Sequence, residues 1–109
     1  MACRVIPAAR VELPLERLPA SQVQAGSPRA GVARVPGVTG LAAGVWEHTA
    51  GVSTDVEVDE VFVVLSGSAT VSFDDGESVE LGPGSVVRLR AGDHTTWVVH
   101  ETLRKIYVA

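Results

Sequence analysis

Several residue types and patterns are scarce in this 109-residue chain. Its single cysteine, Cys3, cannot form a disulfide within the chain, which fits a reducing compartment. The 9 basic residues are outnumbered by 13 acidic ones and are scattered, so the basic stripe of a nucleic-acid-binding protein is missing. No apolar run approaches the ~20 residues of a membrane-spanning helix, and the first residues lack the apolar segment of a signal peptide. The sequence therefore predicts a cytoplasmic protein with no nucleic-acid or membrane partner.

Apolar residues, by contrast, are plentiful, at 46% of the chain. A chain of this length forms one domain and buries about two-thirds of its unfolded surface, which is enough for a packed core. Ala, Val and Gly are abundant, and there are eight arginines but one lysine. This bias hints at a GC-rich bacterial genome.

The first third of the chain is interrupted by prolines, which break helices and central strands. They stand at Pro7, Pro14, Pro19 and Pro28. We therefore expect residues 1–33 to form an arm of the domain whose main body is residues 34–109. Within and after the arm, the sequence suggests a helical turn at 15–18, an edge strand at 29–34 and a turn at 35–37.

From residue 41 onward, short β-rich runs alternate with turn residues. The Asp75-Gly76 pair between two such runs predicts a hairpin with a type I′ turn. Seven short strands separated by turn residues indicate an all-β sandwich or barrel. The strands are expected at 41–48, 61–65, 69–73, 78–80, 86–89, 95–99 and 104–108.

Two glycine-punctuated segments, Gly51–Gly67 and Gly76–Trp97, resemble the two motifs of the cupin superfamily, with Glu60 at the glutamate position of the first. Further residues extend the likeness to small single-domain cupins related to ureidoglycine aminohydrolase, over about residues 28–109. They include Gly44-Val45-Trp46-Glu47, Pro83-Gly84 and Arg104-Lys105-Ile106-Tyr107. The resemblance implies a jelly-roll barrel, a double-stranded β-helix, that holds a small ligand, and it implies a homodimer.

Metal-binding cupins hold a divalent ion with three histidines and one glutamate, and this sequence departs from that pattern. The His-x-His position falls among residues 53–56, which read Ser-Thr-Asp-Val, and the remaining histidine position falls on Thr95. His94 stands one residue early, which on a strand turns its side chain to the opposite face. We therefore predict no metal and no cofactor. An oxygen-ligand site at Asp55 and Glu60 remains an open alternative.

Glu60 is the strongest candidate for a catalytic residue, because the cupin register points it into the barrel and burial raises the pKa of a carboxyl. It is equally compatible with a structural role as the partner of an interior Arg or Trp N–H. The candidate ligand-binding residues are Trp46, Phe62, Trp97, Lys105 and Tyr107. Trp46 and Glu47 lie on opposite faces of one strand, and alternation alone does not decide which faces inward.

Other polar residues are interpreted as surface or structural. These are the three histidines (His48, His94 and His100), the arginines Arg88 and Arg90, and most of the acidic run that includes Asp55, Glu57 and Asp59. Three functions remain open. The first is a metal-free cupin that binds a small polar molecule. The second is a metal-dependent enzyme like ureidoglycine aminohydrolase, acting on a small substrate with C–N bonds. The third is a structural or partner-binding module whose barrel is filled by side chains.

Overall fold

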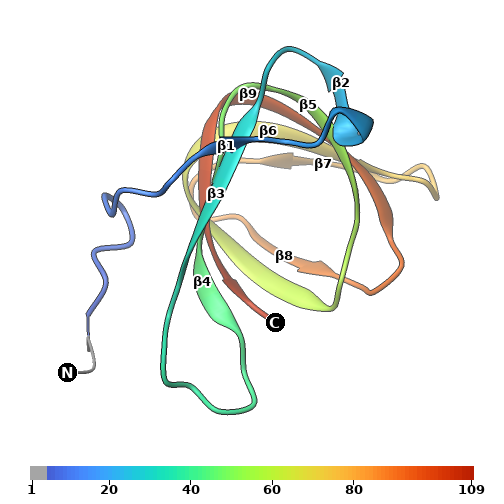
Figure 1. Cartoon of the computed structure of the whole chain (residues 1–109). Coiled ribbons are helices and arrows are strands. Elements are labelled where there is room, and N and C mark those ends of the chain that lie inside the picture. The colour runs from blue at the N-terminus through green and yellow to red at the C-terminus, as the bar shows by residue number, and fades with distance from the viewer. Residues whose placement is uncertain (1–4) are drawn as a thin grey trace.

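The computed structural model describes residues 5–109, so Cys3 lies outside the described residues. The strands form one strongly curled sheet (Figure 1). The elements in chain order are β1 (Glu16–Arg17), the short 3-10 helix η1 (Ala20–Gln22), β2 (Val23–Ala25), β3 (Arg29–Arg34), β4 (Ala43–His48), β5 (Gly51–Val56), β6 (Glu60–Phe73), β7 (Ser78–Leu81), β8 (Val86–Leu89) and β9 (His94–Val108). The all-β cupin barrel predicted from the sequence is confirmed.

Strand β9 pairs with three other strands of the sheet. Its first half pairs with β5 and its second half with β4, while β6 runs antiparallel along its other side for almost its whole length. Trp46 pairs with Lys105, and Ser53 pairs with Trp97, which in turn opposes Val71. Because directly paired residues lie on the same face of a sheet, this register brings residues from four strands to one concave surface.

The core forms on that concave face through period-two alternation. In β6, Phe62 and Val64 are buried, whereas Val61 is exposed on the other side. The sequence predicted this alternation, and it is confirmed. The buried cluster comprises Phe62, Val64, Ala69, Val71, Leu81, Leu89, Trp97, Val99, Leu103 and Tyr107. Each large apolar side chain buried there contributes about 1.5–3 kcal/mol to folding.

The glycine that closes the first motif, Gly67, lies where β6 bends. The pairing of β6 with β9 shifts register on both sides of it, between Val64 and Ala69. Gly67 has φ +90°, and a Cβ at this position would lie 2.7 Å from the carbonyl carbon of Thr102 and 2.8 Å from the Cα of Leu103. Such distances are below any normal contact. Only glycine lets the two long strands approach so closely while β6 turns.

Several expected elements differ from those observed. The runs 61–65 and 69–73 are one strand, β6, and the runs 95–99 and 104–108 are one strand, β9. The helical turn expected at 15–18 is wrong, because Glu16–Arg17 is a strand and the 3-10 helix comes later. Strands β2 and β5 were not predicted. The turn at 35–37 is confirmed.

The hairpin between β6 and β7 is confirmed, but its turn is not type I′. Gly76 has φ +97°, and no described non-glycine residue has a positive φ, so Asp75 does not adopt the conformation that type I′ requires. The Gly76 N–H instead donates to the Phe73 carbonyl at 3.0 Å, and Phe73 N–H donates to the Glu77 carbonyl at 2.8 Å. These bonds close a three-residue loop that ends on a left-handed glycine.

The N-terminal arm joins the same sheet. The strand expected at 29–34 is present as β3, which pairs with β4 along its length and with β1 at its first residues. Strand β2 pairs with β5. The Ala8 carbonyl accepts a 3.1 Å hydrogen bond from Arg104 Nη1, which ties the arm to the convex face. Among residues 5–109, no helix is long and apolar enough to cross a membrane.

Candidate ligand-binding cavity in the barrel

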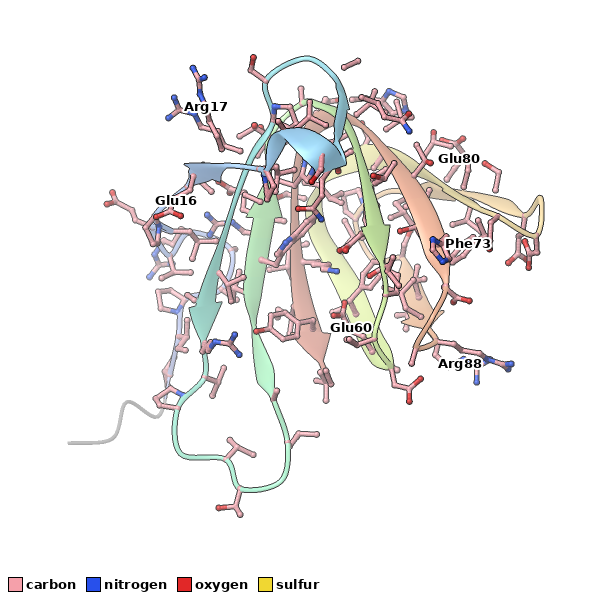
Figure 2. All side chains as sticks on the ribbon, turned by 45° about the vertical axis from the view of Figure 1, so that its right-hand side comes forward. Glu16, Arg17, Glu60, Phe73, Glu80 and Arg88 are labelled. Atoms are coloured by element: carbon pink, nitrogen blue, oxygen red, sulfur yellow. The ribbon has the colours of Figure 1, made fainter. Side chains whose placement is uncertain are left out.

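A cavity of about 210 Å³ lies on the concave side of the sheet. Glu60 lies at the start of β6, at the edge of this region (Figure 2). Residues from β4, β5, β6, β9 and the N-terminal arm form its walls. They are Leu18, Gln22, Val32, Trp46, His48, Ser53, Thr54, Asp55, Glu57, Glu60, Trp97, Lys105 and Tyr107. The barrel is therefore not completely filled by its own side chains.

Lys105, the sole lysine, projects from β9 into this interior and is 5% exposed. Its Nζ donates to Glu60 Oε2 at 2.7 Å. The same nitrogen lies 4.1 Å from the ring centre of Phe62, 4.6 Å from that of Trp46 and 5.1 Å from that of Trp97. A desolvated cation–π contact contributes about 2 kcal/mol. The ammonium is therefore in contact with one carboxylate and three aromatic faces.

Glu57 is the second interior carboxylate. Its Oε2 accepts hydrogen bonds from Thr95 Oγ1 at 2.6 Å and from Trp97 Nε1 at 3.0 Å. Burial raises the pKa of Glu57 and the two hydrogen bonds oppose that rise, while the charges of Asp55 and Lys105 act in opposite directions. Within residues 5–109, the salt bridges involve Glu47 and Glu60 but not Glu57. Glu57 is thus a partly desolvated carboxyl that no cation of the described residues contacts directly.

His48 forms a neutral part of the wall. Its Nδ1 lies 2.6 Å from the Thr49 carbonyl, which can only accept, so Nδ1 carries the proton. Nε2 then accepts from Ser53 Oγ at 2.8 Å. Burial lowers the pKa of His48, with hydrogen bonding to the Thr49 carbonyl acting against it. Both ring nitrogens are engaged, so the imidazole is fixed in position and uncharged.

Most of the residues predicted to form the site meet in this cavity. Those that line it are Trp46, Glu60, Trp97, Lys105 and Tyr107. Phe62 does not line the cavity and instead packs behind the Lys105 ammonium. Trp46 is the inward residue of its pair, because Glu47 accepts from Arg104 at 2.8 Å on the opposite face. Whether Glu60 is catalytic stays a prediction.

Sequence reasoning missed Glu57 and the inward position of His48. Glu57 was assigned to a solvated acidic loop, whereas it is half-buried and bonded to Trp97. The signal was present, since Ser53, Asp55 and Glu57 continue one period-two face beyond the end of β5. His48 is 2% exposed, so the surface interpretation is wrong for it and the structural one fits.

The other polar predictions agree better with the structure. Thr95 points inward with 2% exposure, and His94, one residue earlier, is exposed as expected. His100 is exposed and within 3.0 Å of Thr70 Oγ1. Arg88 extends away from the barrel on β8 (Figure 2), and Arg90 is exposed as well. Both arginines belong to a solvated face.

The donors at the cupin metal positions do not fit a divalent metal ion. Glu60 is paired with Lys105, Ser53 donates to His48, and Thr95 donates to Glu57. In the described part of the chain, no three His, Cys, Asp or Glu side chains are grouped so that they could hold a metal. Asp55 and Glu60 line the same cavity, but Glu60 Oε2 already accepts from the ammonium of Lys105.

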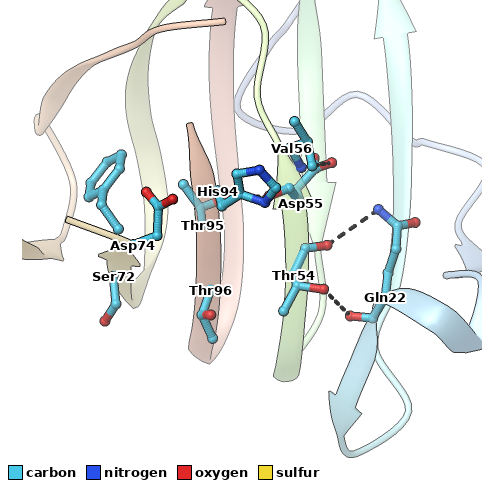
Figure 3. Close-up of a pocket in the computed structure, with 10 residues that line it drawn as sticks. Gln22, Thr54, Asp55, Val56, Ser72, Asp74, His94, Thr95 and Thr96 are labelled. Carbon is cyan, nitrogen blue, oxygen red and sulfur yellow. Dashed lines mark hydrogen bonds between the residues drawn. The ribbon is translucent and has the colours of Figure 1, made fainter. Parts of the chain in front are cut away.

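A second, more open groove of about 390 Å³ runs across the ends of β5, β9 and β6 (Figure 3). Thr54, Thr96 and Ser72 are paired in register across these strands, so their hydroxyls form a row. Gln22 from η1 bonds to the Thr54 carbonyl at 3.3 Å and closes one end. This groove has an exposed polar lining, whereas the barrel cavity holds the buried charges.

Residues 39–107 match the EutQ-like cupin domain family. The chain belongs to this family. Its fold is shared by a Rhizobium leguminosarum protein of unknown function, with TM-score 0.65, 29% identity, and 72% of this chain and 78% of that chain covered. Clostridium difficile EutQ has TM-score 0.65 and 21% identity over 75% of this chain. A putative ethanolamine utilization protein Q from Salmonella typhimurium has TM-score 0.62 and 18% identity, with 92% and 96% of the two chains covered.

The matched part of this EutQ-like cupin spans 62% of Clostridium difficile EutQ. No curated protein matches the chain. The comparisons therefore establish the family and the fold. They do not show membership of the ureidoglycine aminohydrolase family.

Proposed function

We propose that this EutQ-like cupin binds a small molecule bearing an amine or another cationic group inside the barrel, without a metal ion. The observation that carries the proposal is Glu57, a half-buried carboxyl with a raised pKa, two hydrogen bonds and no cation in direct contact among residues 5–109. A buried carboxylate is costly unless it is paired. A cationic ligand beside Glu57 would supply that partner.

The charge of the cavity lining supports a cationic ligand. Three residues with carboxyl groups line the cavity, the half-buried Glu57 and Glu60 and the exposed Asp55, together with one ammonium, that of Lys105. His48 contributes no charge, because burial lowers its pKa. With Lys105 already paired to Glu60, the remaining charge is negative. An anionic ligand would meet this negative charge, whereas an amine would be attracted to it.

The size of the cavity supports a small ligand. A volume of 210 Å³ is below the range of about 300–1,000 Å³ that is usual for drug-sized ligands. It corresponds to about seven waters at liquid density. The rings of Trp46, Trp97 and Tyr107 line the cavity and provide apolar and cation-binding faces. The name of the Salmonella relative mentions ethanolamine utilization, which makes small amino alcohols suitable first probes.

Any proton transfer in the cavity would be better served by Glu57 than by Glu60. A general acid or base works best with a pKa near the working pH, and burial moves the pKa of Glu57 in that direction. Glu60 Oε2 is already engaged by the ammonium of Lys105 at 2.7 Å. The donor set does not fit a metal-dependent mechanism of the ureidoglycine aminohydrolase type. The homodimer implied by the sequence resemblance stays a prediction.

A thermal-shift titration tests the proposal. Small primary amines, neutral alcohols of the same size and small carboxylates would be compared at pH 8, where Glu57 is more ionised than at pH 5. We expect amines to raise Tm with concentration and to do so less at pH 5, because a ligand of the native state stabilises it. Equal shifts from alcohols or carboxylates would contradict the proposal.

The matched variants are Glu57→Gln and Glu77→Gln. The glutamine amide in E57Q keeps an oxygen that can accept from Thr95 and Trp97 but carries no charge, so the amine response should be lost. Glu77 is exposed, with its backbone N–H bonded to Asp75, and its replacement should leave the response unchanged. An amine response that survives in E57Q would assign binding to another group.

A further inference from the structure

Three aromatic faces and one carboxylate surround a single ammonium, that of Lys105. The carboxylate oxygen of Glu60 is 2.7 Å from Nζ, and the rings of Phe62, Trp46 and Trp97 have their centres within 5.1 Å. Proteins that recognise free alkylammonium compounds use the same combination of aromatic faces around the cation. Here the recognised cation belongs to the chain itself.

The Lys105 ammonium lies beside the glutamate of the first cupin motif. Glu60 occupies the glutamate position of the first cupin motif, and its oxygen faces Nζ of Lys105. The positions that would carry imidazoles hold Ser53 and Thr95, which bond to His48 and Glu57 instead. One positive charge is therefore present beside Glu60, and it comes from a side chain.

We propose that Lys105 is a tethered cation that takes the place of a metal ion in this barrel, and that the cage around it is an alkylammonium-binding site. The site becomes open to a free ligand when the lysine side chain is removed. This assignment does not depend on which molecule binds beside Glu57. Trp46 and Lys105 are paired on adjacent strands, so the backbone register positions Trp46 beside the lysine.

The test is chemical rescue of Lys105→Ala. Alanine retains Cβ, and the deleted atoms Cγ, Cδ, Cε and Nζ correspond to n-propylammonium. All measurements are made in the Glu57→Gln background, so that amine binding at Glu57 does not contribute. We expect K105A/E57Q to have a lower Tm than E57Q. At propylammonium concentrations tenfold above Kd, its Tm should rise by roughly 6–11 °C.

Two controls test whether the rescue depends on the charge of the ligand and on the Glu60 carboxylate. Neutral 1-propanol has the same size as propylammonium and should restore much less stability. Adding Glu60→Gln to the double variant should abolish the rescue, because the carboxylate that binds the ammonium is gone. Rescue by propanol equal to that by propylammonium, or rescue that persists with E60Q, would overturn the proposal. So would the absence of any saturable response in a folded K105A/E57Q protein.

If K105A/E57Q does not fold, a double-mutant cycle with Lys105→Met decides. Methionine fills the cage without charge and leaves Glu60 unpaired, so K105M should be less stable than K105M/E60Q. If the effects of K105M and E60Q on the urea midpoint are additive, the ammonium is not held by Glu60 and the proposal is wrong. The failure of either test would leave the amine response assigned to Glu57 unaffected, so the two proposals are distinguishable.

Discussion

Replacing Gly67 with alanine should be among the most damaging small substitutions in the chain. A left-handed backbone costs a non-glycine residue about 1–2 kcal/mol. The new Cβ would also press against the backbone of Thr102 and Leu103, at 2.7 Å from the nearest carbonyl carbon and 2.8 Å from the nearest Cα. Neither strand can yield without disturbing the pairing of β6 with β9, and such overpacking adds about 1–3 kcal/mol. We expect a total loss of about 2–5 kcal/mol.

Gly76→Ala is the matched control, because Gly76 has φ +97° and a Cβ added there would meet no atom within 4 Å. It should lose only the backbone contribution, about 1–2 kcal/mol. Urea unfolding followed by the fluorescence of Trp46 and Trp97 measures both variants, provided that the slopes m agree. If Gly67→Ala is within about 0.5 kcal/mol of Gly76→Ala, the close approach of the two strands is not what requires glycine, and the reasoning fails.

Two predictions concern pH. The raised pKa of Glu57 means that the folded state binds its proton more tightly than the unfolded state. Stability should therefore fall as pH rises from about 4.3 through the elevated pKa, and Glu57→Gln should remove that slope in urea midpoints measured across this range. The lowered pKa of His48 has the opposite effect on stability, so stability should fall as pH drops below about 6.5. His48→Asn, which can still donate to Thr49, should flatten this acid limb; an unchanged limb would show that other groups cause it.

The fold was predictable because the alternation of inward and outward side chains along a strand follows directly from the order of the residues. Glu60, Phe62 and Val64 share a face whichever strands lie beside them. Local patterns did not reveal that the predicted strands are continuous. Residues 66–68 and 100–103 separate the predicted runs, but β6 and β9 continue through them. Strand β5 was missed because half of its residues are polar, and polar residues on an inward face are recognisable only when their partners are known.

The site was predicted in outline for the same reason. Trp97 could be placed inside because it lies two residues after Thr95 and therefore shares its face. The pairing of Lys105 with Glu60 has no local signal, because 45 positions separate the two residues. The role of Glu57 depends on Thr95 and Trp97, which reach it across the sheet.

The position of β9 in the sheet has a consequence for biosynthesis. This strand bridges β4, β5 and β6, yet it is translated after all three. Until β9 emerges from the ribosome, β4 and β5 lack the neighbour that joins them to β6, and their open edges are free to pair with other chains. The barrel therefore cannot close before β9 is available. A nascent chain paused before β9 would be the form most dependent on chaperones.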